Sequence, residues 1–424
     1  MNLNIKNYFF DIIDTVDMDV FFRFSICFTF CFLFLFSCSS RHSESTLTEG
    51  PPYVVDLDGK QELSIPLSTY FRNAKIIPLE TRKDCMIGRI SSLQVFDGYV
   101  YVLDSHVARS MFVFDIDGRF VKKIGSVGRG PGEYTKINDF TLDTKNQFIY
   151  LLDFGQRIHK YSFDGTYLQT ITPMIHKTNA IFIQYYNGRL YLSIRAWTPK
   201  PDDYMLLSID PLDGKVLSSS LSYKYNKGWN KLFFTGHSFF MSRLNSPPLY
   251  AQLFMDYVVT VDENIVPYIE LKSRNLVKHS DLEGFINDNS YSDNFREDFR
   301  ERSKIWDVHD YVENDEFFMF RYRTGFRVFN TAIYDKRSGD VKLVRSLDND
   351  LVFKENDKNQ IYRKFVFSDK NCAYEILEGV ILDDFLESIK NDELIPDLDK
   401  IDDLIKLSKS NLEPNPIIIY YEFK

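Results

Sequence analysis

Short runs of alternating β-branched and aromatic residues recur along most of the chain, and a turn signal precedes each run. Residues 97–104 read Asp-Gly-Tyr-Val-Tyr-Val-Leu-Asp, residues 146–153 read Asn-Gln-Phe-Ile-Tyr-Leu-Leu-Asp, and residues 187–193 read Asn-Gly-Arg-Leu-Tyr-Leu-Ser. A period of two is typical of β-strands, because successive side chains of a strand point to opposite faces of the sheet. The pattern predicts an all-β protein.

A second turn signal follows each of these runs, at Asp117-Gly118, Asp164-Gly165 and Asp213-Gly214. Asp-Gly between alternating hydrophobic residues indicates a β-hairpin, since both residues tolerate the positive φ of tight turns. The second turns recur at roughly 45–50 residues, which is the period of a four-stranded propeller blade. We therefore expect a β-propeller.

Five blades can be assigned directly to the chain. The first has strands at 91–97, 99–104, 110–116 and 120–124, and the second at 139–142, 148–153, 157–163 and 167–171. The third covers 180–220, the fourth 238–272 with strands at 249–255 and 257–262, and the fifth 305–347 with strands at 316–322, 330–335 and 341–347.

Strand-like runs at both ends of the chain complete a sixth blade. Residues 361–367, 373–377 and 416–423 provide three strands, and residues 74–79 provide the fourth. Closing the ring in this way removes sheet edges that would otherwise invite misassociation. The prediction is a six-bladed β-propeller in which N- and C-terminal strands close one blade. Small helical insertions are expected near 280–304 and 392–410, where apolar residues recur at near-helical spacing.

The N-terminus has the features of a bacterial lipoprotein signal. Residues 24–37 are uncharged and rich in Phe and Leu, and they are too few for a comfortable membrane span of about 20 residues. Leu35-Phe36-Ser37-Cys38 resembles a lipobox, in which the Cys thiol carries the lipid and becomes the new N-terminus. The alternative is a short apolar anchor that stays attached, with Cys38 an ordinary thiol.

The expected organisation is therefore a signal peptide at 1–37, a linker at 38–60 after the lipidated Cys38, and a propeller at 61–424. Acidic residues precede the apolar run, which is unusual for a signal peptide. Translation from Met18 would remove most of them, together with residues 1–17.

Composition adds few constraints. Aromatic residues make up 16% of the chain, which suits pleated and half-buried surfaces. The net charge of −9 is spread along the sequence without a long basic run, so nothing indicates nucleic-acid binding. Of the five Cys, only Cys85 and Cys372 lie in the propeller, either as one disulfide or as buried apolar residues. The chain has no C-x-x-C pair to indicate a zinc site.

Three motifs could carry chemistry, and a structural role is expected for each. The loop Gly128-Arg129-Gly130-Pro131-Gly132 lacks the Lys-Ser/Thr and the following helix of a phosphate-binding loop, so we interpret it as a connector between blades. The run 115–118 (Asp-Ile-Asp-Gly) lacks the Glu that closes a calcium loop and is expected to be a hairpin turn. Asp104 and Asp153 occupy the same place in successive blades, which favours acceptance of backbone N–H bonds over a unique active site.

One segment resembles a known family. Gly128-Arg129-Gly130-Pro131-Gly132-Glu133-Tyr134 is followed by 137–140 (Ile-Asn-Asp-Phe), 149–153 (Ile-Tyr-Leu-Leu-Asp) and 157–161 (Arg-Ile-His-Lys-Tyr). It is similar to an NHL-type propeller blade, and more closely to the six-bladed β-propeller lipoproteins of Bacteroidota. The resemblance implies the fold and an envelope location. It implies no established activity, and so no catalytic residues.

Three hypotheses for function remain open. The first is a lipid-anchored binding module that presents one face to a glycan, a peptide or an envelope protein. The second is a lyase or hydrolase that uses a divalent cation in the channel, which would require His and carboxylate side chains converging at the axis. The third is a scaffold subunit of an outer-membrane complex. A cluster of His, Asp and Glu at the axis would favour the enzyme, and an exposed aromatic platform would favour glycan binding.

The binding module is the preferred hypothesis. It has no predicted catalytic residue, metal ligand or cofactor, its ligand is not identified, and Cys38 is the one assigned site. The protein is expected to be a monomer on the outer membrane. The periplasmic face is favoured, because the acidic residues that accompany surface export do not follow Cys38.

Overall fold

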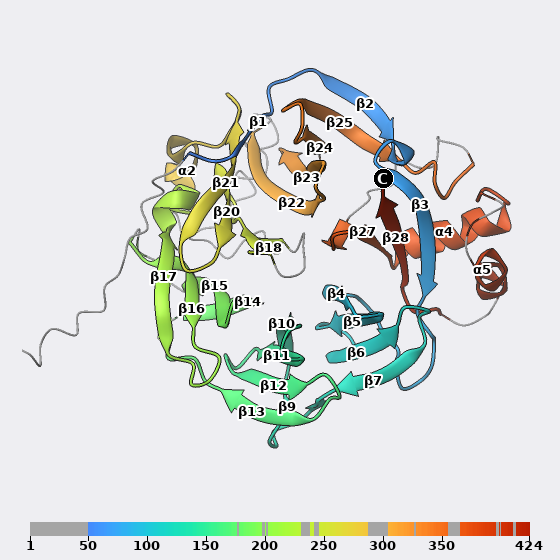
Figure 1. Ribbon diagram of the computed structural model, residues 1–424, viewed down its shortest axis with the longest axis horizontal. Helices are drawn as coiled ribbons and strands as arrows, with labels where there is room; N and C mark the ends of the chain where they lie inside the picture. The colour runs from blue at the N-terminus through green and yellow to red at the C-terminus, as the bar shows by residue number, and fades with distance from the viewer. Residues whose placement is uncertain are drawn as a thin grey trace, which may run out of the picture. The chain divides into compact units, whose positions relative to one another are not determined.

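The computed structural model describes residues 50–175, 178–196, 200, 202–229, 238–240, 246–286, 304–325, 328–354, 365–395, 398, 400–409 and 413–424. Six sheets of four or five strands surround a central axis, and the first strand of each lies nearest the centre (Figure 1). The predicted six-bladed β-propeller is confirmed.

The first three blades follow one another along the chain. Blade 1 contains β4 (Ser92–Phe96), β5 (Tyr99–Asp104), β6 (Ser110–Asp115) and β7 (Phe120–Ile124). Blade 2 contains β10 (Ile137–Asp143), β11 (Phe148–Asp153), β12 (Ile158–Ser162) and β13 (Tyr167–Ile171). Blade 3 contains β14 (Thr178–Tyr186), β15 (Arg189–Ala196), β16 (Tyr204–Ile209) and β17 (Val216–Ser222). A short parallel pair, β8 (Ser126–Val127) and β9 (Glu133–Tyr134), connects blades 1 and 2.

The other three blades each receive a strand from the N-terminal segment. Blade 4 contains β18 (Phe239–Phe240), β19 (Leu249–Tyr250), β20 (Tyr257–Val261), β21 (Ile265–Lys272) and, outermost, β1 (Tyr53–Asp56). Blade 5 contains β22 (Ile305–Glu313), β23 (Phe317–Thr324), β24 (Val328–Asp335), β25 (Val341–Asp348) and β2 (Gln61–Pro66). Blade 6 contains β26 (Phe365–Ser368), β27 (Cys372–Leu377), β28 (Ile417–Phe423) and β3 (Phe71–Pro78).

The two ends of the chain close the ring in blade 6, as predicted. Strand β28 pairs antiparallel with β3, from Ile417 opposite Pro78 to Phe423 opposite Phe71. The pairing joins residues from opposite ends of the sequence and completes the four strands of blade 6.

The segment predicted to be a linker, 38–60, contains strand β1 of blade 4, and strand β2, which follows the linker, was not predicted either. Strand β1 pairs parallel with β21, with Tyr53 opposite Ile269, and β2 pairs parallel with β25, with Gln61 opposite Leu343. These strands were missed because they are short and parallel to partners more than half the chain away, so no local hairpin pattern marks them.

Each blade buries both of its faces, which explains the long hydrophobic runs. In β5, Val100 and Val102 pack with blade 6, whereas Tyr101 and Leu103 pack with blade 2. Alternate side chains of one strand therefore serve two interfaces. Equivalent clusters fill the other contacts between neighbouring blades around the ring.

The helical insertions differ in part from those expected. Helix α2 (His279–Ile286) coincides with the start of the predicted helix at 280–304, and residues 287–303 lie outside the described ones. Helix α5 (Ile401–Ser408) begins well after residue 392, because Asp392 and Lys400 have φ of 58° and 57°, which a right-handed helix does not allow. Helix α4 (Val380–Lys390) was not predicted. Single 3-10 turns occur at Leu67–Thr69 and Tyr223–Asn226.

One predicted strand is shorter in the structure, and another is described only in part. Strand β19 ends at Tyr250, short of residue 255, and Phe254 has a φ of 66°, which is outside the β region. The strand expected at 361–367 is described only from Phe365, and residues 361–364 lie outside the described ones. Among the helices of the described residues, none has the length and apolar character to cross a membrane.

The alternation of strand direction gives the ring two distinct faces. The hairpin between the first and second strands of a blade lies at one end, as at Asp97-Gly98, Asn146-Gln147 and Asn187-Gly188. We call this end the inner-hairpin face. Helix α2 connects blades 4 and 5, and α4 and α5 connect β27 to β28, so all three belong to the opposite face.

Candidate functional site

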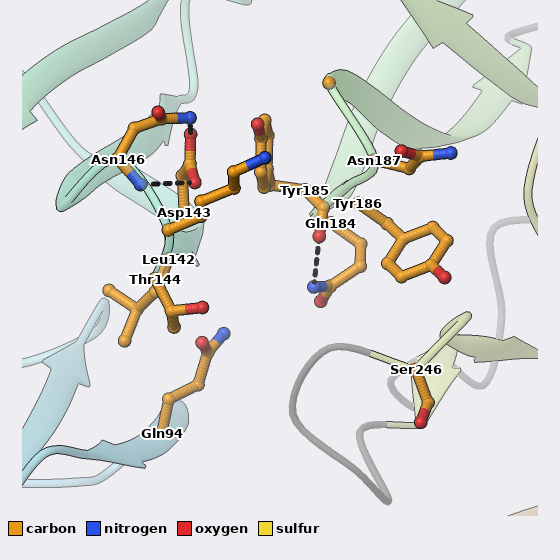
Figure 2. A pocket seen from close by; sticks show the side chains of 12 residues that line it. Gln94, Leu142, Asp143, Thr144, Asn146, Gln184, Tyr185, Tyr186, Asn187 and Ser246 are labelled. Carbon is orange, nitrogen blue, oxygen red and sulfur yellow. Dashed lines mark hydrogen bonds between the residues drawn. The ribbon is translucent and has the colours of Figure 1, made fainter.

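A pocket of about 480 Å³ lies on the inner-hairpin face, where the first hairpins of blades 2 and 3 meet β4 of blade 1 (Figure 2). It is lined by Gln94, Leu142, Asp143, Thr144, Lys145, Asn146, Gln184, Tyr185, Tyr186, Asn187, Gly188 and Ser246. Its volume lies in the range of small-molecule sites, and most of its lining side chains are polar. We take it as the candidate functional site.

Two tight turns position the pocket walls. At the end of β10, the Asp143 carboxylate accepts hydrogen bonds from Asn146 N at 3.1 Å and Asn146 Nδ2 at 2.7 Å, which fixes the turn to β11. In blade 3, Asn187 and Gly188 have φ of 46° and 78° and form the two-residue turn between the paired Tyr186 and Arg189. This is the turn that Asn-Gly favours, because both positions need positive φ.

Two glutamine side chains reach the pocket from inner strands. Gln94 on β4 is 5% exposed and Gln184 on β14 is 2% exposed. Gln94 Nε2 donates to Phe140 O of blade 2 at 3.3 Å, and Gln184 Nε2 donates to Tyr185 O at 3.1 Å. Figure 2 shows the two amide groups directed toward the pocket from different sides. An amide has two N–H donors and a carbonyl acceptor, so a single bond leaves capacity for a ligand.

Two neighbouring tyrosines form the aromatic part of the wall. The Tyr185 ring stacks on Tyr150, with centroids 5.6 Å apart and planes 15° from parallel. Burial, and then the nearby Asp143 carboxylate, raises the pKa of Tyr185 to about 12, so its hydroxyl keeps its proton at neutral pH. The Tyr186 ring packs against the cluster between blades 3 and 4, and it also lines the pocket. Both rings are therefore held in place by the blades.

The inner strand of blade 5 carries the acid and His side chains that an axial metal site would use, but they are paired otherwise. His309 Nδ1 lies 2.8 Å from Asp310 Oδ2, and Arg321 Nη1 lies 3.1 Å from the same oxygen. Arg323 Nε donates to Asp307 Oδ2 at 2.6 Å. In the part of the chain that the structure describes, no three His, Cys, Asp or Glu side chains are grouped to hold a metal ion.

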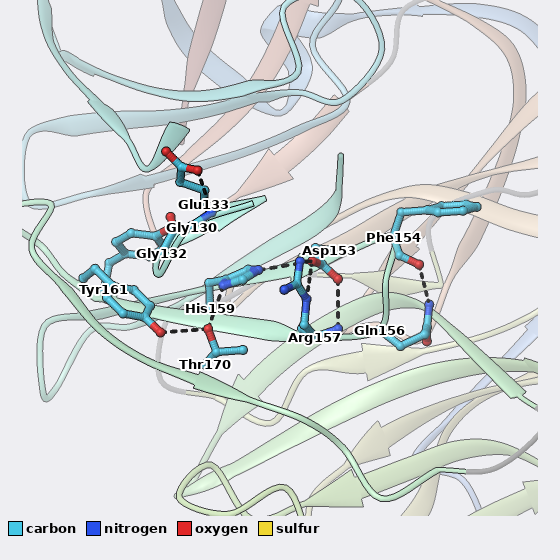
Figure 3. A network of polar contacts seen from close by, with 11 residues as sticks. Gly130, Gly132, Glu133, Asp153, Phe154, Gln156, Arg157, His159, Tyr161 and Thr170 are labelled. Atoms are coloured by element: carbon cyan, nitrogen blue, oxygen red, sulfur yellow. Dashed lines mark hydrogen bonds and ion pairs between the residues drawn. The ribbon is translucent and has the colours of Figure 1, made fainter. Parts of the chain in front are cut away.

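The glycine-rich loop has the geometry of a connector, as predicted. Gly130 N donates to Glu133 Oε2 at 2.7 Å, and the Tyr161 hydroxyl donates to the Gly132 carbonyl (Figure 3). The Glu133 carboxylate occupies the side of the loop where a phosphate would need free N–H groups. The positive φ of Gly132, 73°, is a second reason for glycine in this loop.

Asp153 anchors a polar network beside this loop (Figure 3). It accepts from Arg157 N at 2.9 Å and Arg157 Nη2 at 2.7 Å, and His159 Nε2 lies 3.2 Å from its carboxylate. His159 Nδ1 is in turn 3.0 Å from Thr170 Oγ1. The order Asp–His–Thr is that of an activated nucleophile, but Arg157 neutralises Asp153, and the Tyr167 hydroxyl is 2.8 Å from Thr170 Oγ1. The network joins the three outer strands of blade 2.

The equivalent Asp104 of blade 1 accepts backbone hydrogen bonds, as predicted. Its oxygens accept from Gly88 N and Val107 N, both at 2.8 Å. Burial alone would raise the pKa of this carboxyl, but backbone N–H groups, those of Val107 and Ala108 foremost, lower it by more. The pKa of Asp104 is therefore below its usual value.

The remaining sequence predictions have mixed outcomes. The run 115–118 is a hairpin turn, with Asp115 N donating to Arg119 O at 2.9 Å. Cys85 and Cys372 are free thiols, so the disulfide alternative is wrong. Both pack in the cluster between blades 6 and 1, and burial raises the pKa of Cys372 to about 12. Cys38 lies outside the described residues.

The pocket itself was not predicted from the sequence. Its turn Asn187-Gly188 was recognised as a hairpin signal, but Gln94, Asp143 and Gln184 carry no motif. The one sequence signal for the two glutamines was a polar residue within an otherwise hydrophobic run.

The fold and the pocket define a six-bladed β-propeller with a polar site near its axis. The chain belongs to the family described as Domain of unknown function (DUF4934), whose model matches residues 52–422. No curated protein matches the chain by sequence.

The chain is similar to solved structures at low sequence identity. A Bacteroides fragilis protein whose name describes it as exported has a TM-score of 0.63 at 18% identity, over 88% of this chain and 99% of its own. A Bacteroides vulgatus member of the DUF4221 family has a TM-score of 0.49 at 12% identity, over 84% of this chain and 97% of its own. The first likeness agrees with the propeller fold.

Proposed function

We propose that the protein is a lipid-anchored binding module of the cell envelope, which takes its ligand in the pocket on the inner-hairpin face. The observation that carries the proposal is the pair of buried amides, Gln94 and Gln184, directed into this pocket. Each amide donates a hydrogen bond to a backbone carbonyl, and its carbonyl oxygen and second N–H group give it further capacity to bind a ligand, which an apolar side chain would lack.

The chemistry of the pocket favours binding over catalysis. Among the described residues that line it there is no His or Cys, and the carboxylate of Asp143 already accepts two hydrogen bonds from Asn146. A general base or nucleophile needs a neighbour that activates it. The turn that holds Asp143 uses the carboxylate as a structural acceptor instead.

The envelope location rests on the N-terminus. Residues 24–37 followed by Cys38 have the order of a lipoprotein signal, and the similar Bacteroides fragilis protein is described as exported. Lipid attachment at Cys38 would place the propeller at the outer membrane, with the periplasmic face favoured.

Anchoring is tested by Cys38→Ser in the full chain. The protein should move to the soluble fraction or remain unprocessed, because a Ser hydroxyl cannot form the thioether to the lipid. Membrane retention at mature size would contradict lipid attachment at Cys38.

Binding at the pocket is tested with Gln184→Leu, which removes one amide with little change in volume. Fractionated envelope extract is added to the soluble protein, and the melting temperature is measured. We expect some fraction to stabilise the wild type and the control Gln169→Leu, but not Gln184→Leu, since only a ligand that binds the folded state raises its stability. A fraction that stabilises all three equally would show that the ligand binds elsewhere.

A further inference from the structure

Resting on the proposed function, we infer that the ligand of the pocket is an uncharged carbohydrate. The pocket combines buried amides, a held tyrosine ring and balanced charge within one cavity of about 480 Å³. Each of these features matches the chemistry of a sugar ring, which presents many hydroxyl groups and an apolar face.

The amides fit hydroxyl groups in particular. A hydroxyl both donates and accepts hydrogen bonds, and the amides of Gln94 and Gln184 provide donors and an acceptor at fixed positions. The hydrogen bond from Gln94 Nε2 to Phe140 O and that from Gln184 Nε2 to Tyr185 O hold each amide in one orientation. A site that is already oriented loses less conformational entropy when the ligand binds.

The charges in the pocket disfavour ionic ligands. Asp143, which is 1% exposed, is bonded to Asn146 on its own turn, so a cationic ligand would have to replace bonds that already exist. An anionic ligand would meet the same buried carboxylate, and Lys145 is the one cation among the described residues of the lining. An uncharged ligand neither displaces the hydrogen bonds between Asp143 and Asn146 nor is repelled by the Asp143 carboxylate.

Tyr186 supplies an apolar surface beside these polar groups. The ring packs against the cluster between blades 3 and 4, and the residue also lines the pocket next to Asn187. An aromatic ring buries a large area with few rotatable bonds, so it can pack on the apolar face of a sugar at small entropic cost.

The structure provides a matched control for Gln94. Gln169 on β13 donates from Nε2 to Pro211 O of blade 3 at 3.3 Å, just as Gln94 donates from blade 1 to Phe140 O of blade 2 at 3.3 Å. Both amides bridge neighbouring blades, but only Gln94 lines the pocket. Gln94→Leu and Gln169→Leu therefore remove the same kind of bond between blades.

The experiment is calorimetric titration of the detergent-solubilised full-length protein with three groups of probes. These are neutral oligosaccharides from glucans, xylan and mannan, charged sugars such as oligogalacturonate and sugar phosphates, and short acidic and basic peptides. We expect binding of a neutral oligosaccharide with an affinity that does not change with salt, since no ion pair is formed. Gln94→Leu should weaken it about tenfold or more, and Gln169→Leu should not.

Other outcomes separate the two proposals. Binding restricted to charged probes, weakening as salt rises and lost in Gln94→Leu, would overturn the carbohydrate assignment and leave the pocket as a binding site. Neutral-sugar binding that survives Gln94→Leu would overturn the assignment of this pocket. If no probe binds while envelope extract still stabilises the protein through Gln184, the ligand class is wrong and the proposed function stands.

Discussion

Identical side chains have different roles in this ring because their surroundings differ. Gln94 and Gln169 make the same hydrogen bond to a neighbouring blade, but Gln94 faces the pocket and Gln169 lies on an outer strand. Glycines differ in the same way. Gly98 and Gly132 have φ of 75° and 73°, yet a Cβ would meet nothing within 4 Å at Gly98 and would lie 2.6 Å from the Tyr167 ring at Gly132.

This difference predicts unequal effects of alanine. Gly98→Ala should destabilise the protein by about 1 kcal/mol, the cost of positive φ for a side chain. Gly132→Ala should cost about 2–4 kcal/mol, because the clash with Tyr167 adds to the backbone strain. Denaturant unfolding of both variants measures the difference. Equal losses would show that the Tyr167 ring moves aside freely.

The buried carboxylate of Asp104 predicts a pH-dependent effect. The pKa of this group is lowered in the folded state, so its contribution is fully present above the usual Asp pKa and is lost as pH falls through the folded value. Asp104→Asn should therefore cost about 1–3 kcal/mol near neutral pH and progressively less in acid below the usual Asp range. Urea unfolding across that range is the measurement. A cost that is independent of pH would contradict the role of the ionised form.

At the scale of the element, each strand serves two interfaces. In β28, Ile417 and Ile419 pack with blade 5, whereas Ile418 packs with blade 1. A strand in the ring therefore cannot be removed without exposing apolar surface on both sides. This also explains why the strands are recognisable in the sequence, since both faces must be hydrophobic.

Deletion of residues 415–424 is the sharpest test at this scale. It removes β28, leaves β27 and β3 with open edges, and exposes the apolar faces of blades 5 and 1. We expect the truncated chain to aggregate or unfold. Size-exclusion chromatography and thermal melting would reveal this, and a soluble monomer with the original melting temperature would rule out closure by this strand.

At the scale of the whole molecule, the N-terminal segment crosses three blades on their outer edges. Strand β1 joins blade 4, β2 joins blade 5 and β3 joins blade 6 (Figure 1). The N-terminal segment therefore also pairs with blades 4 and 5, in addition to the antiparallel pair that closes blade 6. The Tyr53 ring adds to this pairing through edge contacts with Phe318 and Tyr334 of blade 5, at centroid distances of 5.3 Å.

The pairing of β1 with blade 4 predicts that a truncation that removes β1 destabilises the propeller. A chain that begins at residue 60 lacks β1 and loses the burial of Val55 and Leu57, which contributes about 3–6 kcal/mol. It should melt at a lower temperature than a chain that begins at residue 50. The pair of truncations serves as its own control. Identical melting curves would show that β1 adds nothing to the stability of blade 4.

Features that depend on residues close together in the sequence could be predicted from the sequence alone. The strands of blades 1 and 2, the Asp-Gly hairpins and the connector role of the glycine loop all follow from a period of two and from turn chemistry. Ring closure was also predictable, because the unpaired strands at the two ends have no other way to cover their edges.

Only the tertiary structure decided what depends on distant residues. Strands β1 and β2 pair with remote parallel partners, so no local hairpin pattern marks them as strands. The pocket likewise needs Gln94 of blade 1 and Gln184 of blade 3, which the ring brings to one face. A buried glutamine has no local pattern that separates a structural amide from a ligand-binding one. The physical reason is that the distinction depends on whether a neighbouring blade or an open cavity faces the side chain.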